Sequence, residues 1–393
     1  SQIPDSVLEV EQARMQILQQ NPVHINRVTA QELHELPFLT EMQIANFIAY
    51  RDANDPFLSM HELQVVTGWN AETIQNTIGY LHCEASLQKW YRAEEPSQQL
   101  LVKWERTLEE KIGFSPITSR SKSRYIGNPL AQNIRYRGKW NGQVRGGFIL
   151  QKDPGEKNMA DFSSYYLEIK PSKWVDKLIL GDYILQWGQG LIQSGGFSLG
   201  KTYESIRATQ KFNLGNLPYS SSGESAFYRG ISTQAHWGAI NLSAFLSIKH
   251  LDASISKDTS GILFYRSIDT DGNHRTTTEI KNKYTLMEQA IGLQVLIPWK
   301  QGYFSFSSTR HAWNLPKRNT QIYNQSEWQG NVLTNLSLAH QIPWKQVLIA
   351  GELASTSPKT LAIIESIAFS ISLMLFLSHG LMRRVFGSSM PTL

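Results

Sequence analysis

The chain has 393 residues, a formal net charge of +5 and a mean hydropathy of −0.31, values that exclude a bundle of membrane helices. Its single cysteine, Cys83, excludes an internal disulfide framework and a thiolate zinc site. The first 82 residues carry ten acidic and three basic side chains, a net of −7, which leaves +12 for the rest. We therefore expect one small and one large domain. The chain begins at Ser1 without methionine or a signal-type leader, as expected of a processed exported protein or of a fragment.

One pattern occurs twice between Ile25 and Leu81, with the two copies 30 residues apart. Each copy has Glu-Leu, a nearby apolar residue, a short break and then apolar residues at helical spacing. This layout predicts a tandem helix-hairpin-helix domain over residues 1–82, followed by a linker over 83–99. The stretch from Ile25 resembles the module of competence-type DNA-uptake proteins. The equivalent pairs are Glu32 and Glu62, Leu33 and Leu63, Leu36 and Val66, Ile44 and Ile74, and Ile48 and Ile78.

The two hairpin turns are the candidate DNA contacts. Such a turn binds phosphate through backbone N–H groups, and glycine allows the close approach because it reaches positive φ. The first turn, Phe38-Leu39-Thr40, has no glycine, and the second, Gly68-Trp69-Asn70, has one, with Asn70 in the place of the other. A net charge of −7 also repels a phosphate backbone. We therefore expect this domain to pack or to dock a protein, and DNA binding is the alternative.

Strand-length segments fill residues 100–354. Asn141-Gly142 joins Ile134–Trp140 to Gln143–Lys152, and Asn-Gly is a strong signal for a hairpin turn. The segment Ala239–Lys249 alternates aliphatic with mostly polar side chains, so one face suits lipid or a core and the other suits water. Further strands are expected at Tyr165–Lys170, Leu178–Gly188 and Phe227–Trp237.

The connections between these strands differ in length. Pro-Trp-Lys-Gln occurs at Pro298–Gln301 and at Pro343–Gln346, and we expect short turns that place Trp299 and Trp344 at one rim. Short turns at one end and long loops at the other are typical of outer-membrane barrels. The expected fold class is therefore α+β multidomain, with the small helical domain followed by an incomplete antiparallel transmembrane-type β-barrel. A soluble β-barrel or sandwich is the alternative. Long polar loops are expected at Asp252–Ser260, Asp269–Lys283 and Leu315–Gln329.

One motif imitates a phosphate-binding loop. Gly195, Gly200, Lys201 and Thr202 fit the pattern G-x-x-x-x-G-K-[ST], which makes a P-loop nucleotide-binding protein a further alternative. A true P-loop lies between a buried strand and a helix, whereas the sequence around this motif is polar and rich in glycine. The expected glycine-rich strand and turn would bind no nucleotide.

Other spacing signals for chemistry are weak. Asp269 and Asp271 imitate the start of a calcium loop, but the twelfth position is Ile280 instead of glutamate. The ten histidines are scattered, and no nucleophile has an adjacent base. The sequence therefore predicts a non-enzymatic protein without a cofactor or metal.

Four motifs occur in a fixed order: GDYILQWGQGLIQSGGFSLGKT from Gly181, PYSSSGESAFYRGISTQAHW from Pro218, HLDASIS from His250 and HRTTTEIKNK from His274. Together they resemble the large helix-hairpin-helix proteins of the Bacteroidota, in which a degenerate N-terminal module precedes an outer-membrane barrel. The resemblance covers roughly Gln12 to Leu353. It implies contact with outer-membrane lipid, a periplasmic N-terminal domain and a periplasmic protein or DNA as its partner. It implies no established activity.

Residues 355–393 form an atypical tail. Thr360–Leu377 abandons the alternating pattern and, at face value, is a marginal membrane helix. Codons for His379–Pro391 can be read from their third bases as R-S-Y-A-P-S-F-W-E-F-Y-A-N, which resembles the continuing barrel sequence of the family. We therefore expect a frameshift between Ala354 and His379.

Overall fold

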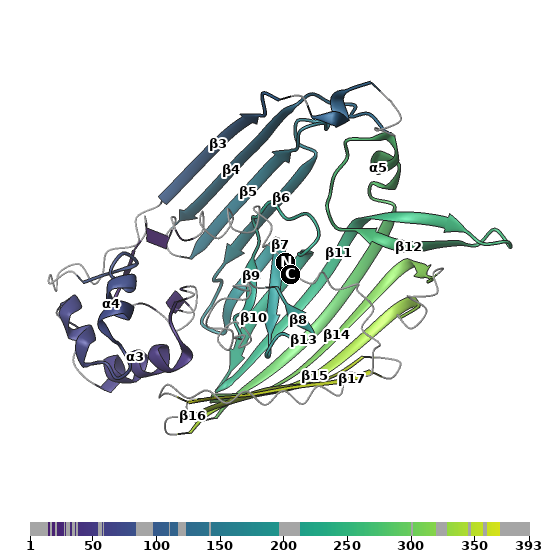
Figure 1. The fold of residues 1–393 in the computed structure, drawn as a ribbon. Coiled ribbons are helices and arrows are strands. Elements are labelled where there is room, and N and C mark those ends of the chain that lie inside the picture. The colour runs from purple at the N-terminus through teal and green to yellow at the C-terminus, as the bar shows by residue number, and fades with distance from the viewer. Residues whose placement is uncertain are drawn as a thin grey trace.

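The structure is a computed structural model in which a small helical domain lies beside a long, curved antiparallel sheet (Figure 1). It describes single residues and short stretches between 15 and 57, and then residues 59–83, 97–109, 111–116, 123–140, 143–195, 213–299, 302–319, 328–344, 347–356 and 360–369. Within these ranges, no helix has the length and apolar character needed to cross a bilayer.

The helical domain is closed by a short parallel ladder between β1 (Val23–His24) and β2 (Leu81–His82). Between these strands lie α3 (Glu41–Ala53), the 3-10 helix η1 (Met60–Val65) and α4 (Ala71–Thr77). The ladder was not expected from the sequence. It joins the two ends of the repeat and so makes the domain a compact unit.

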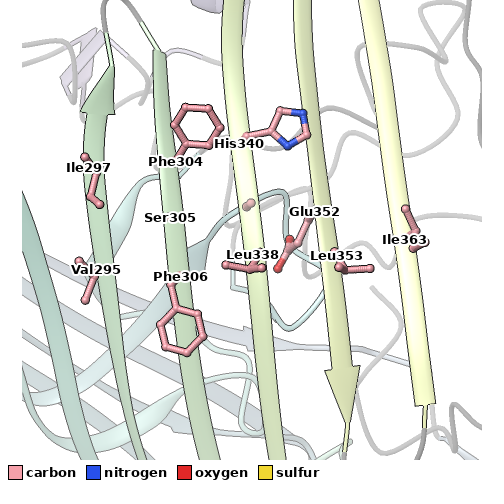
Figure 2. A pocket seen from close by; sticks show the side chains of 11 residues that line it. Val295, Ile297, Phe304, Ser305, Phe306, Leu338, His340, Glu352, Leu353 and Ile363 are labelled. Carbon is pink, nitrogen blue, oxygen red and sulfur yellow. The ribbon is translucent and has the colours of Figure 1, made fainter.

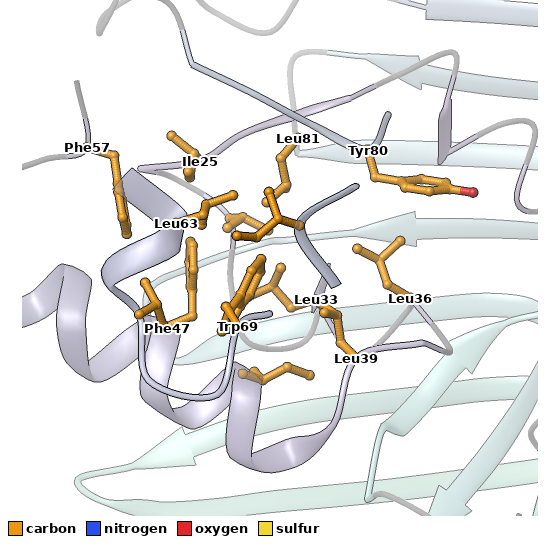
Figure 3. Packing of buried hydrophobic residues seen from close by; sticks show 14 residues of the cluster. Ile25, Leu33, Leu36, Leu39, Phe47, Phe57, Leu63, Trp69, Tyr80 and Leu81 are labelled. Carbon is orange, nitrogen blue, oxygen red and sulfur yellow. The ribbon is translucent and has the colours of Figure 1, made fainter. Parts of the chain in front are cut away.

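The repeated apolar positions form the core of this domain (Figure 3). Leu33 and Leu63, which occupy equivalent positions, are both fully buried. The ring of Phe47 stacks with Phe57 and with Trp69, at centroid distances of 5.3 and 5.4 Å. The predicted equivalence therefore identified the core, except that Ile78 is 53% exposed.

We expect the fragment 1–83 to fold by itself, because its core is its own. Leu63→Ala should lower the free energy of unfolding of this fragment by about 2–5 kcal/mol, since it leaves a cavity in a packed core. Val65→Ala is the matched control, because Val65 is 60% exposed, and should change it by no more than about 0.5 kcal/mol. Urea unfolding followed by circular dichroism measures both, and equal effects would contradict this assignment of the core.

The sheet has the order β17-β16-β15-β14-β12-β11-β10-β7-β6-β5-β4-β3, and β13 also pairs with β11 and β14. The short strands β8 and β9 pair with β7. All these pairings are antiparallel except a single bridge between β12 and β14. The strands are β3 (Ser97–Arg106), β4 (Leu130–Trp140), β5 (Val144–Lys152), β6 (Phe162–Ile169), β7 (Val175–Trp187), β8 (Gln193–Ser194), β9 (Gly215–Pro218), β10 (Tyr228–Trp237), β11 (Ile240–Lys257), β12 (Leu263–Asp269), β13 (Leu286–Trp299), β14 (Gly302–Lys317), β15 (Gly330–Trp344), β16 (Val347–Thr356) and β17 (Thr360–Phe369).

Several predicted elements are confirmed. The strands on either side of each predicted turn pair as antiparallel hairpins: β4 with β5, β13 with β14 and β15 with β16. The turn residues Asn141-Gly142, Lys300-Gln301 and Lys345-Gln346 lie outside the described part of the chain. The loop between β12 and β13 is long and contains the short helix α5 (Thr277–Asn282).

Three predicted boundaries are wrong. The strand β11 continues to Lys257 through most of the expected loop Asp252–Ser260, because it pairs there with β12. The strand β14 likewise continues to Lys317. The segment from Thr360 is strand β17 and not a helix, since it pairs with β16 over the strand's whole length. The sheet thus extends past residue 354, and residues 370–393 lie outside the described part of the chain.

The sheet is apolar on its outer face, and its inner face carries buried polar side chains beside apolar clusters that include Phe245 and Trp313. On β11, Leu246 and Ile248 are 49% and 51% exposed, while Ser247 and Lys249 are buried between them. The same alternation continues across β13 to β16. Exposed outward residues there are Ile291, Leu293, Phe304, Phe306, Leu336, Leu338 and Leu353, and buried inward residues are Gln294, Ser305, Ser307, Ser337 and Glu352.

Candidate functional site

The two hairpin turns of the helical domain lie against each other. The side chain of Gln43, in the first turn of α3, donates from Nε2 to the carbonyl oxygen of Gly68 (2.9 Å) and to Oγ1 of Thr73 (3.0 Å). The indole Nε1 of Trp69 donates in return to the carbonyl oxygen of Gln43 (2.9 Å). The structure thus brings the two candidate turns together around Gln43.

Most of the six candidate DNA contacts are used inside the domain. Leu39 and Trp69 are buried in its core, and Phe38 packs on Tyr80. The backbone N–H of Thr40 donates to Oε1 of Gln43 (2.9 Å). These groups are therefore engaged in packing and internal hydrogen bonds.

The second turn has its own internal bonds. Oδ1 of Asn70 accepts the backbone N–H of Thr73 (2.8 Å) and so caps α4. Gly68 has φ +85, which explains why this position is glycine. Glu72 is exposed in the first turn of α4, where its charge opposes the approach of a phosphate to the helix N-terminus.

Only the start of the motif that imitates a phosphate loop lies in the described residues. The backbone N–H of Gly195 donates to the carbonyl oxygen of Leu185 (2.9 Å), directly after β8 pairs with β7. This N–H therefore completes a strand pairing instead of facing a phosphate. Gly200, Lys201 and Thr202 lie outside the described residues.

The helical domain contacts the sheet at its short-turn end. An Nη2 atom of Arg145, at the turn between β4 and β5, lies 3.8 Å from Oε1 of Glu32. Figure 1 shows the domain beside this end of the sheet. Exposed tryptophans mark the same rim: Trp174, Trp237 and Trp299 are 66%, 74% and 43% exposed.

Several connections converge at the opposite, long-loop end, and we call this cluster the loop junction. The backbone N–H of Ile126 donates to the carbonyl oxygen of Arg275, and that of Gly127 donates to Gly155 (both 2.8 Å). A Cβ atom at Gly127 would lie 1.8 Å from the carbonyl oxygen of Glu156, so this close approach requires glycine. The loop junction consists of Ile126, Gly127, Gly155, Glu156, Asp161, Glu224, Asp252, His274, Arg275 and Lys283.

His274 is the centre of the loop junction and is only 3% exposed. Its Nδ1 hydrogen-bonds Oδ2 of Asp161, and its Nε2 lies 2.6 Å from Oδ2 of Asp252. Its backbone N–H donates to Oε1 of Glu156 (3.0 Å). Lys283 adds a second cation, because its Nζ donates to Oδ1 of Asp161 (2.8 Å). One imidazole ring thus connects the loop before β6 to strand β11.

Two ionisable groups of the loop junction, His274 and Glu224, have strongly raised pKa values. Burial lowers the pKa of His274, but the hydrogen bonds to Asp161 and Asp252 outweigh burial and raise this pKa from 6.5 to about 9. Burial, together with the charge of Glu156, raises the pKa of Glu224 to about 9. At neutral pH, therefore, an imidazolium lies between two carboxylates and Glu224 is neutral.

Glu156, Asp161 and His274 place their possible ligand atoms within 4.8 Å of one another, close enough to share a metal ion. These atoms already have partners within the protein. Both imidazole nitrogens face carboxylates, and Oε2 of Glu156 accepts the backbone N–H of Asp153 (2.8 Å). His274 and Lys283 already supply positive charge beside these carboxylates. The expected absence of a metal stays a prediction.

Sequence reasoning did not bring these residues together. Asp161 and His274 are 113 residues apart, and isolated histidines carry no spacing signal. The available hint was that His274 begins one of the four ordered motifs and Asp252 lies in another. Their shared contact gives a physical reason for both motifs.

The loop junction should open as the pH rises. His274 binds its proton more tightly in the folded protein, so its stabilising contribution is complete below about pH 6.5 and is lost as the pH approaches 9. Glu224 acts with the same sign, because its folded pKa is also raised. Limited proteolysis of residues 153–161 and 270–285 at pH 6 and pH 9 measures the change. His274→Gln should weaken this pH dependence, and equal protection of the parent protein at both pH values would contradict the assignment.

The apolar outer face, the buried polar side chains of the inner face and the tryptophan rim give the large domain the fold of a transmembrane-type β-barrel portion. The small domain belongs to a known motif class, since residues 19–82 match the profile of the helix-hairpin-helix motif. A search of curated proteins found no match.

Solved structures similar to the chain include three outer-membrane proteins. Wzi of Escherichia coli, described as a carbohydrate-binding β-barrel involved in group 1 capsule assembly, has 13% identity over 61% of this chain, with a TM-score of 0.27. The chain spans about half (52%) of the Wzi chain. A loop-deletion mutant of OmpT from Vibrio cholerae has 9% identity, with 69% and 86% of the two chains covered and a TM-score of 0.25. OmpF of Salmonella typhi in complex with daunomycin has 9% identity, with 69% and 83% covered and a TM-score of 0.24. The barrel assignment therefore rests on the side-chain distribution.

Proposed function

We propose that the chain is a non-enzymatic outer-membrane barrel protein whose helical domain lies in the periplasm and docks a protein partner. The observation that carries this proposal is the apolar-outside, polar-inside sheet with an acidic domain at its short-turn end. In outer-membrane barrels the short turns face the periplasm and the long loops face the exterior. The loop junction would then lie on the external side.

The outer face of the sheet supplies the lipid contact in this proposal. An apolar groove of about 370 Å³ lies on it across β13 to β17, lined by Phe304, Phe306, Leu338, Leu353 and neighbouring side chains (Figure 2). The groove is continuous with the exposed aliphatic residues of the same strands, so hydrocarbon is the environment that suits it.

A protein partner suits the helical domain better than DNA does. The domain has a net charge of −7, and its turn groups are engaged internally. The helix-hairpin-helix profile match keeps DNA as the competing ligand to be tested.

Membrane insertion can be tested with one substitution at mid-strand and one at the rim. Leu246→Arg should strongly reduce insertion, because a charge on the lipid face costs about 2–4 kcal/mol near the bilayer midplane. Trp237→Arg, at the short-turn rim, should have little effect, since the cost falls to about 0–1 kcal/mol near the interface. Heat-modifiable migration after reconstitution into vesicles measures the folded fraction. Equal tolerance of both changes in a water-soluble protein would overturn the barrel proposal.

DNA binding can be tested with the fragment 1–83. We expect no affinity for duplex DNA beyond weak non-specific binding, with a dissociation constant above about 10⁻⁴ M, because an acidic surface releases few counterions. Fluorescence anisotropy across a salt series measures this affinity. Micromolar binding that weakens with salt and is lost in Gly68→Ala would replace protein docking with DNA binding. Retention of the fold in Gly68→Ala, checked by circular dichroism, makes that loss interpretable.

A further inference from the structure

Two described parts of the connection between β7 and β10, residues 188–195 and 213–218, lie on the inner face of the sheet. After Trp187 the chain leaves β7, and residues 215–218 return to pair with β7 as β9. Figure 1 shows β8 and β9 inside the curve of the sheet. Gln189, Ile192, Gln193 and Asn216 are each no more than 5% exposed.

This connection contacts strands that are far from β7 in the sheet. Nε2 of Gln189 donates to the hydroxyl oxygen of Tyr303 on β14 (3.3 Å), and Nδ2 of Asn213 donates to Oε1 of Gln294 on β13 (3.4 Å). A Cβ atom at Gly188 would lie 3.0 Å from the Cβ of Ala339 on β15. Because all these partners face inward, residues 188–195 and 213–218 cross the space enclosed by the sheet, and we call them the inner segment.

Glu352 on β16 accepts two hydrogen bonds from the inner segment. Its Oε2 accepts the backbone N–H groups of Gln189 (2.8 Å) and Leu191 (3.0 Å), and the residue is 2% exposed. Gly188 and Gly190 have φ +62 and +82, so nearby N–H groups curve around one carboxylate. Such an arrangement of backbone N–H groups is a known way to bind an anion.

The facing wall is built to receive the inner segment. Several buried inward side chains on β14, β15 and β16 are small, so backbone can fill the space beside them. These buried residues are Ser305, Ser307, Ser337, Ala339 and Ala350.

We propose that the inner segment is a plug held across the lumen by Glu352, and that release of this carboxylate exposes the inner wall. The plug rests on the proposed barrel function and adds to it a latch between β7 and β16. Hydrogen bonds to a charged acceptor are stronger than neutral ones, so loss of the two bonds at Glu352 changes the plug more than loss of any other single contact named above.

The test uses the full chain with Cys83→Ser and Ala339→Cys, which places one thiol under the plug. In the parent protein this thiol should react slowly with a membrane-impermeant maleimide. Glu352→Ala should accelerate the labelling at least about tenfold, because two hydrogen bonds to a charged group are lost. Glu288→Ala is the matched control, since Glu288 is an inward carboxylate whose partner, Nδ1 of His311, belongs to the wall (3.1 Å). It should leave the rate unchanged.

Two further variants keep the result decisive. Tyr303→Phe removes the hydroxyl that accepts from Nε2 of Gln189 and should accelerate labelling less than Glu352→Ala does. Glu352→Gln keeps the side-chain shape without its charge and replaces Glu352→Ala if that variant does not fold. Heat-modifiable migration identifies folded protein in each case. Unchanged labelling in a folded Glu352 variant, or a parent thiol that reacts equally fast, would overturn the plug. Failure of the parent itself to insert would instead overturn the barrel proposal.

Discussion

The alternation of side chains along the strands, seen most clearly on β11 and β13 to β16, is the constraint on which the rest of the structure depends. Successive residues point to opposite faces of a sheet, so a register that places Leu246 outward places Ser247 inward. A slip of one residue would expose every polar side chain of the strand to the apolar side and reverse the chemistry of both faces. The pairings from β3 to β17 are therefore fixed by the difference between the two faces as much as by their backbone hydrogen bonds.

The positions of the other features follow from this register. Antiparallel pairing sends alternate connections to opposite ends, which separates the short tryptophan-bearing turns from the loop junction. The ion pair between Glu32 and Arg145 joins the acidic domain to the short-turn end of the sheet. The polar inner face also supplies Glu352, a carboxylate that no apolar core would accept without the N–H groups that surround it.

Local patterns in the sequence correctly predicted the elements that depend mainly on residues close together in the chain. The Asn141-Gly142 hairpin, the repeated core around Leu33 and Leu63, and the alternation on β11 are all visible within a few neighbouring residues. The length of β11 and the existence of β17 were missed, because each depends on a partner strand that extends the pairing.

The sites were harder to predict than the fold. The loop junction joins residues more than a hundred positions apart, and its central His274 has no ligand-like spacing. The glycines at positions 188 and 190 stood in a motif that resembled a family pattern, but their role depends on Glu352 in a distant strand. In both sites the sequence motifs contain some of the residues involved, but they do not indicate which distant residues those contact.

The contact between Gln189 and Glu352 has a consequence for the order of assembly. The two residues are 163 positions apart, and a contact of such long range requires closure of a long loop, which costs conformational entropy. Pairing of strands β10 to β15 brings Glu352 near the turn after β7, and so lowers the entropy cost of this contact. Before β16 is paired, the backbone N–H groups of Gln189 and Leu191 lack this acceptor, so the contact forms only in a protein whose wall includes β16.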